Sequence, residues 1–261
     1  MEVTRPAASA WATALEGWRI PEEILAVAPE SPWQLPPSMF AFDHGAAATP
    51  THTRVDEALP ERGTLLDVGA GEGAASLPMA ARASGIVAVD ESEMMLKRFA
   101  EAAERAGAVH AEVLGEWPGV SASVAAADVV VCANVVYNIA GIVSFVTALV
   151  NHAQHRVVVE ASARHPLTAT APLWNRFHPA APRPDGPSVD DLVAVLAEMG
   201  IRCQTEFFKR HRASRGTRAE LVAFVRRRLC VTADHDAEID AWMGDPPSLG
   251  LDNMATLWWD V

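Results

Sequence analysis

Lysine, cysteine and tyrosine are scarce in this sequence of 261 residues. Lys97 and Lys209 are the only lysines, so arginine supplies nearly all of the positive charge. Lys and Arg together number 21 against 33 Asp and Glu, which gives a formal net charge of −12. A chain this acidic has no overall field that would attract it to phosphate backbones or anionic membrane surfaces. The composition therefore disfavours nucleic acid and membranes as partners, and its low lysine and high alanine content is typical of bacterial genomes rich in G and C.

The three cysteines, Cys132, Cys203 and Cys230, are odd in number and contain no Cys-x-x-Cys spacing. They predict neither a disulfide framework nor a zinc site, and they are compatible with a reducing compartment. We interpret the one clustered set of possible ligands, Asp234-His-Asp236, as a solvated turn. We therefore expect no metal site.

Long apolar runs are also missing. The longest nearly uncharged stretch, Ile139 to Val150, is shorter than the roughly 20 residues that span a bilayer. The N-terminus lacks the charged start and apolar core of a secretory signal. We expect a soluble, cytoplasmic protein.

Apolar strand-like runs alternate with helical patterns from Thr64 onward. The expected strands are 64–68, 86–90, 109–114, 129–133, 156–160, 201–208 and 254–260. The expected helices are 73–83, 93–106, 141–153, 188–200, 217–229 and a short one near 237–243. This alternation predicts an α/β fold with a doubly wound, mostly parallel seven-stranded sheet and helices on both faces.

We divide the chain into two parts by the texture of the sequence. Residues 1–60, where tryptophans alternate with prolines, are expected to form an N-terminal helical lid with two short helices. Residues 61–261 are expected to form one Rossmann-like domain. Within it, the proline-rich segment 166–187 is expected to be an irregular excursion that serves as a substrate lid.

The segment Asp67-Val-Gly-Ala-Gly-Glu-Gly73 follows an apolar strand and precedes an expected helix. Gly69 and Gly71 permit positive φ angles and let a ligand approach the backbone. The start of the expected helix would offer free N–H groups to an anion. That anion could be the pyrophosphate of a dinucleotide or the carboxylate of a methionine group, and the turn by itself leaves both open.

Asp90 ends the next expected strand, where a carboxylate can accept hydrogen bonds from both hydroxyls of a ribose. The series Gly69-x-Gly71-x-x-Ala74 also satisfies the dinucleotide fingerprint, so NAD is a competing cofactor. Three features weigh against NAD: the acid Asp67 before the first glycine, the third glycine Gly73, and the Asp-Glu-Ser-x-Met-Met-Leu stretch that begins at Asp90.

Together these motifs resemble those of class I S-adenosylmethionine-dependent methyltransferases, over about residues 64–160. The resemblance implies S-adenosylmethionine as cofactor and S-adenosylhomocysteine as product. It also implies that Gly69, Ala70 and Gly71 line the methionine part, that Asp90 binds the ribose, and that Glu91 and Met95 flank the adenine. The segments 134–138, 157–160 and 172–178 look similar to actinobacterial methyltransferases of unassigned substrate.

The sequence departs from the family where many members hold the adenine amino group. Val113-Leu-Gly-Glu-Trp-Pro118 has no acid at the end of the third strand, and Trp117 replaces a leucine. The backbone near Leu114 or the side chain of Glu116 is left to bind the adenine, and the sequence does not choose between them.

Asn134-Val-Val-Tyr137 ends the fourth expected strand, where the family's methyl acceptor meets the sulfonium. Its spacing is similar to the Asn-Pro-Pro-Tyr of amino-group methyltransferases, but both prolines are missing. We interpret it as a strand end, with Asn134 touching the cofactor and Tyr137 lining the pocket. No aspartate is present there, which argues against the magnesium-dependent catechol type.

Four further residues are candidates for the acceptor pocket. His165 and His178 could each act as a general base for a hydroxyl acceptor, although a structural role is the more common one for a lone histidine. Trp174 and Phe177 could form an aromatic wall or simply pack the lid. We interpret the arginine-rich stretch from Lys209 to Cys230 as a solvated helix face rather than an RNA-binding patch.

The predicted function is therefore direct in-line methyl transfer from S-adenosylmethionine to a small-molecule acceptor. The alternatives are an NAD(P)-dependent Rossmann oxidoreductase and a non-catalytic cofactor-binding protein. The only tyrosine, Tyr137, is followed four positions later by Gly141, so the Tyr-x-x-x-Lys pair of one large dehydrogenase group is missing. The sequence leaves open the acceptor atom, the general base, if any, and the oligomeric state.

Overall fold

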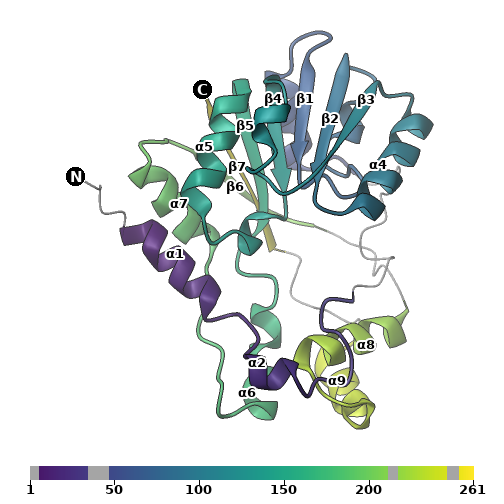
Figure 1. Cartoon of the computed structure of the whole chain (residues 1–261), viewed down its shortest axis with the longest axis vertical. Helices are drawn as coiled ribbons and strands as arrows, with labels where there is room; N and C mark the ends of the chain where they lie inside the picture. Colours follow the sequence, from purple (N-terminus) through teal and green to yellow (C-terminus); the bar gives the residue numbers. More distant parts are fainter. Residues whose placement is uncertain (1–5, 35–46, 211–216, 246–252) are drawn as a thin grey trace.

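A single seven-stranded sheet organises the chain in the computed structural model, which describes residues 6–34, 47–210, 217–245 and 253–261. The strand order is β3-β2-β1-β4-β5-β7-β6 (Figure 1). The bounds are β1 Thr64–Val68, β2 Gly85–Asp90, β3 His110–Leu114, β4 Ala127–Ala133, β5 Ala153–Ser162, β6 Gln204–Lys209 and β7 Asn253–Asp260. The strands β1 to β5 are parallel, whereas β7 pairs antiparallel with both β5 and β6. The predicted fold class is confirmed.

The central strands have apolar residues at consecutive positions because both faces of the sheet are covered. Leu65 and Leu66 are each 0% exposed, and they belong to different core clusters on opposite faces. One face packs against α1 (Pro6–Glu16), α5 (Ile142–His152) and α7 (Val189–Glu198). The other face packs against α3 (Pro50–Ala58) and α4 (Glu93–Ala106).

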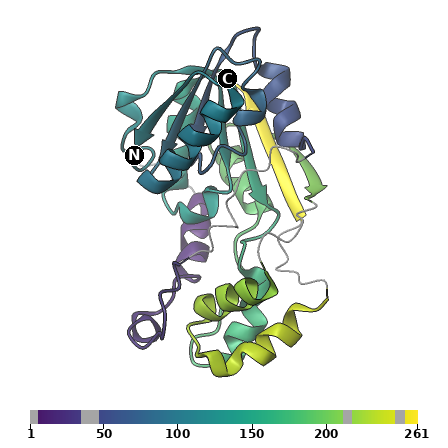
Figure 2. The ribbon, with the colours of Figure 1, turned by 90° about the vertical axis from the view of Figure 1, so that its right-hand side faces the viewer.

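Four further helices form a separate layer beyond the carboxyl ends of the parallel strands (Figures 1 and 2). They are α2 (Glu22–Leu25), α6 (Ala171–Phe177), α8 (Arg218–Leu229) and α9 (Asp236–Met243). We call this layer, with the segments that join α2 and α6 to the sheet, the cap. It has its own apolar core, formed by Ile20, Leu173, Trp174, Leu221, Val222, Phe224, Val225, Leu229, Ile239 and Met243.

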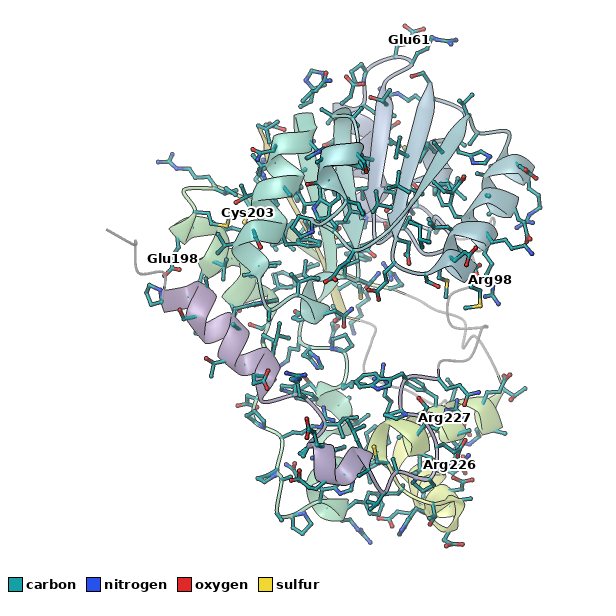
Figure 3. All side chains as sticks on the ribbon, viewed as in Figure 1. Glu61, Arg98, Glu198, Cys203, Arg226 and Arg227 are labelled. Atoms are coloured by element: carbon teal, nitrogen blue, oxygen red, sulfur yellow. The ribbon has the colours of Figure 1, made fainter. Side chains whose placement is uncertain are left out.

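The N-terminal residues contribute to both layers. Trp11 of α1 is 1% exposed within the core of the sheet, and its indole Nε1 donates to the carbonyl of Ile139 at 2.9 Å. Glu198, at the end of α7, accepts hydrogen bonds from the first amides of α1, Ala7 at 2.8 Å and Ala8 at 3.3 Å (Figure 3). Thus α1 and α3 are sheet-covering helices, and only α2 of this segment lies in the cap.

The helix expected over 73–83 is wrong. The chain forms turns there, with one 3-10 helix at Leu77–Met79. Pro78 has no N–H to donate to the carbonyl of Ala74, and its ring disfavours helical geometry before it. His52 satisfies that carbonyl instead: its Nδ1 accepts from the Thr49 amide at 3.0 Å, so its Nε2 carries the proton that is donated to Ala74 at 2.9 Å.

The segment 166–187, expected to be irregular, contains the helix α6. Pro172 lies in the first turn of α6, where a missing N–H costs nothing. In the described ranges no helix is both long enough and apolar enough to cross a membrane.

We predict that Trp11→Ala lowers the free energy of unfolding by about 3–5 kcal/mol, because it empties a fully buried site between α1 and the sheet. Chemical denaturation measures this change. The matched control is Trp33→Ala, at a side chain that is 60% exposed, and it should cost less than about 1 kcal/mol. Equal effects of the two variants would contradict a core role for α1.

Candidate functional site

The glycine-rich loop after β1 turns back on the end of β2. The amides of Gly69 and Ala70 both donate to the carbonyl of Val89, at 2.8 and 3.1 Å. Gly69, Gly71 and Gly73 all have positive φ angles, +69°, +54° and +84°. The amides of Gly71 and Gly73 are also bonded within the protein, to Asp90 Oδ2 and to the carbonyl of Ala70, so these backbone bonds fix the shape of the loop.

The three glycines are required for different physical reasons. A Cβ on Gly69 would lie 2.2 Å from Cγ2 of Val135, and a Cβ on Gly73 would lie 2.6 Å from the side chain of Leu77. These two glycines allow the loop to pack against its neighbours. A Cβ on Gly71 would meet nothing within 4 Å, so Gly71 faces open space that a ligand could fill.

Asp90 is attached to the loop. Its Oδ2 accepts from the amide of Gly71 and its Oδ1 from the amide of Ser92, both at 2.9 Å. Each carboxylate oxygen can accept more than one hydrogen bond, so both can still bind a hydroxyl. Of the other predicted cofactor residues, Leu114 is aligned with Asp90 on β3 and is 55% exposed, Glu91 is exposed, and Met95 is half-buried in the first turn of α4.

Asp67 lies buried directly behind the loop, with 1% of its surface exposed. Its Oδ2 accepts from Ser76 Oγ at 2.6 Å, while its Oδ1 has no hydrogen-bond partner. Burial raises the pKa of Asp67 to about 7; the Ser76 hydrogen bond opposes this rise, and the nearby charge of Asp90 adds to it. A half-satisfied buried carboxylate at this place would favour a positive charge on a ligand in the loop.

Glu72 and Arg98 attach the loop to α4. The Arg98 guanidinium donates to Glu72 Oε1 at 2.8 Å, and the Glu72 side chain is only 12% exposed. Figure 3 shows Arg98 at the end of α4 that faces the cap. The loop is therefore held by β2, by α4 and by its own turn bonds, so its shape is fixed before any ligand arrives.

Asn134 follows β4 in a left-handed conformation, with a φ of +62°. Its amide donates to the carbonyl of Glu160 at 2.8 Å, and its Nδ2 donates to Glu160 Oε1 at 3.3 Å. Asn134 is exposed, and the adjacent Val135 contacts Gly69. Asn134 therefore lies at the end of β4 next to the glycine loop, and its contact with a cofactor stays a prediction.

Sequence analysis did not identify Glu160 as a site residue. This buried carboxylate, 4% exposed at the end of β5, accepts from Thr51 Oγ1 at 2.7 Å and is paired with Arg210. Thr51 in turn lies 2.7 Å from the hydroxyl of Thr256 on β7. The signal available in the sequence was an acid that closes the otherwise apolar run Val157-Val-Val-Glu160.

The three residues predicted to line the acceptor pocket, Tyr137, Trp174 and Phe177, do not lie together. Tyr137 is buried, stacks on Trp11 and donates its hydroxyl to the carbonyl of Ser162 at 2.8 Å. Trp174 is 1% exposed in the cap core, and Phe177 packs against His235 within the cap. Tyr137 belongs to the edge of the sheet, and the other two belong to the cap.

The two candidate bases occupy different surroundings. His165 lies between Trp18 and Tyr137, with ring centroids 4.3 and 5.7 Å away. Burial and, to a smaller extent, the charges of Arg183 and Arg228 lower the pKa of His165 to about 4, so the ring is neutral at pH 7 and a weak base. His178 lies 2.7 Å from the carbonyl of Leu229 through Nε2, so it donates there within the cap.

The arginines of α8 are not a solvated face. Arg226 pairs with Glu30 at 2.8 Å and with Asp236 at 2.7 Å, and Arg218 pairs with Asp240 at 2.5 Å. Figure 3 shows Arg226 and Arg227 on α8 within the cap. These ion pairs connect the parts of the cap to one another. Among the described residues, no group of three His, Cys, Asp or Glu side chains could hold a metal ion.

Residues 65–156 match the family model described as a methyltransferase domain. This range contains the glycine loop, Asp90 and the end of β4. A search of curated proteins found no relative of this chain.

Solved structures with the same fold are distant in sequence. A cyclopropane-fatty-acyl-phospholipid synthase-like protein from Lactobacillus casei is 11% identical, with 81% of this chain and 89% of that chain covered and a TM-score of 0.55. Magnesium protoporphyrin IX methyltransferase from Synechocystis, with bound S-adenosylhomocysteine, is 16% identical (80% and 77% covered, TM-score 0.50). A precorrin 8w decarboxylase from Methanobacterium thermoautotrophicum is 13% identical (87% and 100% covered, TM-score 0.50).

The chain thus shares the fold of solved proteins that include a methyltransferase with bound S-adenosylhomocysteine, and its residues 65–156 match a methyltransferase domain model.

We predict a pH-dependent difference in stability between the wild type and Asp67→Asn. The pKa of Asp67 in the folded protein, about 7, exceeds its ordinary value of 3.8. Its contribution to stability is therefore fully present below pH 3.8 and is lost as the pH rises to 7. The free energy of unfolding of Asp67→Asn, relative to that of the wild type, should therefore rise by a few kcal/mol between pH 4 and 8. The basis is about 1.4 kcal/mol per unit of pKa shift.

Denaturation at several pH values measures this difference. Asp128→Asn is the control with the opposite sign, because hydrogen bonds from Thr64 lower the pKa of Asp128. Asp128 stabilises the fold above its unfolded pKa and loses that contribution as the pH falls. Parallel stability curves for the wild type and Asp67→Asn would contradict the ionisation assigned to Asp67.

Proposed function

We propose that this chain is an S-adenosylmethionine-dependent methyltransferase that acts on a small-molecule acceptor. The cofactor supplies a methyl group on a sulfonium, which passes in line to an oxygen, nitrogen or carbon nucleophile and leaves S-adenosylhomocysteine. The single observation that carries the proposal is the open space at Gly71, which lies beside the Asp90 carboxylate within the matched methyltransferase domain.

The residues present fit such a cofactor. Gly69, Ala70 and Gly71 would hold its amino-acid part, because the loop has no side chain where Gly71 faces open space. Asp67 would attract the ammonium group from behind the loop through its half-satisfied carboxylate. Asp90 would accept from the ribose hydroxyls. Gly73 is expected to shape the loop, Glu91, Met95 and Leu114 to flank the adenine, and Asn134 to contact the cofactor from the end of β4.

NAD fits this fold less well. The dinucleotide-binding Rossmann sheet has the order 3-2-1-4-5-6, whereas here the antiparallel β7 lies between β5 and β6. A dinucleotide also places its pyrophosphate at the start of the helix that follows the glycine loop. The turn segment at 73–83 provides no such helix start. Both observations favour a methyl donor over a hydride carrier.

The chain's own residues would contribute mainly orientation and exclusion of water. Effective positioning can lower a barrier by several kcal/mol, roughly 7–11 in the best cases, without a dedicated base. His165, neutral and weakly basic in this fold, is suited to packing against the acceptor rather than to taking a proton from it. The cap lies over the carboxyl edge of the sheet and would cover the reacting atoms (Figure 2).

A small acceptor agrees with the charge distribution. The arginines Arg218 and Arg226 are paired with acids inside the cap, so they are not free to follow a phosphate backbone. The formal charge of −12 opposes such binding further. The experiment is transfer of labelled methyl from S-adenosylmethionine into RNA, DNA and a small-molecule extract at physiological salt. We expect label in the extract; label in RNA would contradict the proposal, and no transfer to any of them would favour a non-catalytic binding protein.

Asp90→Ala should weaken binding of S-adenosylhomocysteine by about 10- to 100-fold, the effect of losing charge-assisted hydrogen bonds of roughly 1.5–3 kcal/mol. Calorimetric titration measures the dissociation constant. The wild type should bind S-adenosylmethionine and S-adenosylhomocysteine but not NAD. An unchanged constant for Asp90→Ala would remove Asp90 from the site, and tight binding of NAD alone would overturn the cofactor assignment.

Gly71→Ala should abolish measurable binding of S-adenosylhomocysteine, because its methyl group would occupy the space assigned to the ligand. The matched control is Gly107→Ala at the end of α4. Gly107 has a similar positive φ of +67° and a Cβ there also meets nothing within 4 Å. Both variants should lose about 1 kcal/mol of stability from the left-handed conformation, but Gly107→Ala should bind normally. Normal binding by Gly71→Ala would place the cofactor elsewhere.

A further inference from the structure

In the described residues, two arginines of the cap, the buried Arg183 and the half-buried Arg228, have no acidic partner. Arg183 is only 8% exposed, and its guanidinium lies over the rings of Trp18 and Trp174, at 4.8 and 4.0 Å from their centroids. Arg228 lies over Trp33 and Phe224, at 5.1 and 5.8 Å. In the part of the chain that the structure describes, neither guanidinium forms an ion pair. By contrast, Arg226, two residues earlier on α8, forms ion pairs with two acids, Glu30 and Asp236.

Hydrogen-bond donors in this region lack acceptors. Arg183 uses Nη1 to donate to the carbonyl of Trp18 at 3.2 Å, but its Nε is buried with no partner. The Nε of Arg228 and the indole Nε1 of Trp18 are also buried without a partner. All three atoms are donors. Since buried donors are nearly always satisfied in native proteins, this cluster indicates that an acceptor group belongs there.

The electrostatics point the same way. Burial and, to a smaller extent, the charge of Arg228 lower the pKa of Arg183 to about 10. The rings under the two guanidiniums, Trp174 and Phe224, belong to the same apolar core of the cap. Burial also lowers the pKa of Arg228. A buried cation is costly unless it is paired, and contact with aromatic rings offsets only part of that cost. A negative charge between the two groups would remove the repulsion.

The geometry of the unpartnered donors of Arg183 selects the kind of anion. The flat guanidinium of Arg183 contacts indole rings, so its remaining strong interactions lie in its own plane. Nε is buried without a partner, and within the described residues Nη2 makes no hydrogen bond, so the protein supplies no acceptor to these two donors. Two parallel donors of this kind match the two oxygens of a carboxylate or of a phosphate.

The cluster lies next to the expected reaction site. Trp18, which contacts Arg183, packs against His165, and His165 packs edge-on against Tyr137. Tyr137 lies in the 3-10 turn Val136–Asn138, which follows β4 and Asn134 at the carboxyl edge of the sheet. An acceptor held by Arg183 would therefore extend from the cap toward the end of β4.

We propose that Arg183 and Arg228 form an oxyanion-binding subsite that orients a methyl acceptor carrying a carboxylate or a phosphate. The assignment of the anion to the acceptor rests on the proposed methyltransferase function, whereas the anion site itself does not. Both arginines are positioning residues: they hold one end of the acceptor while its nucleophilic atom lies at the edge of the sheet.

The first experiment uses the full chain and three probes of similar size: benzoate, phenyl phosphate and the neutral benzamide. Tryptophan fluorescence and the melting temperature report binding, because Trp18 and Trp174 contact Arg183. We expect a saturable response to benzoate or to phenyl phosphate and none to benzamide. The stronger of the two responses identifies the oxyanion. No response to either anion, or an equal response to benzamide, would overturn the proposal.

Arg183→Gln and Arg228→Gln should each weaken the response by about 10-fold or more, as expected for the loss of a charge-assisted hydrogen bond. Arg228→Gln keeps the test valid if Arg183→Gln fails to fold. The matched control is Arg176→Gln, at an exposed arginine of the cap that pairs with Glu238 at 2.8 Å. Its response should be unchanged. Retention of the full response by both Arg183→Gln and Arg228→Gln would overturn the proposal.

Binding of S-adenosylhomocysteine separates this proposal from the previous one. It should be unchanged in Arg183→Gln and Arg228→Gln, since neither residue touches the glycine loop. If the wild type binds S-adenosylhomocysteine but no anion, the subsite alone is wrong; if it binds anions but not S-adenosylhomocysteine, the cofactor assignment is wrong. Finally, a small-molecule extract is divided by anion exchange before the methyl-transfer assay. Acceptors should be in the retained fraction, and label confined to the neutral fraction would contradict the proposal.

Discussion

The buried carboxylate of Glu160 is the constraint on which the edge of the sheet depends. It ends β5, and its oxygens accept from Thr51 on α3, from Asn134 after β4 and from Arg210 after β6. One side chain thus connects segments that are far apart in the sequence. An unpaired carboxylate at this depth would be costly, so the segments that donate to it are held together. The left-handed turn at Asn134, and with it the approach of Val135 to Gly69, follows from this arrangement.

The proposed cofactor site and the proposed acceptor subsite lie in different parts of the molecule. The glycine loop is a rigid part of the sheet, because β2, α4 and its own turns hold it from three sides. The cap has a core of its own and ion pairs of its own, and it faces that loop from the other side of the carboxyl edge (Figure 1). Variation in the cap can therefore change which acceptor is bound without disturbing the loop.

The loop itself shows how one proline changes the chemistry of a common motif. With a full helix after the glycines, a row of free amides and a helix dipole would face the ligand, which suits a pyrophosphate. Pro78 prevents that helix, and His52 from α3 takes over the carbonyl that the helix would have used. What remains is a short turn, with Asp67 behind it and Asp90 beside it. This is an environment for a ligand with a positive charge and two hydroxyls.

The sequence by itself determined the central strands β1, β4 and β5, because residues buried on both faces of a sheet are mostly apolar at consecutive positions. It also determined the glycine loop and Asp90, because their chemistry is local. It also determined that α4 and α8 would form, through their caps and periodicity. Only the tertiary structure decided that α1 belongs to the core, that 73–83 is not helical, and that Arg183 and Arg228 have no acidic partner among the described residues. A local pattern records which residues are apolar or polar. It does not record which distant group pairs with a given charge or carbonyl. That partner decides the free-energy cost of burying the charge or the carbonyl.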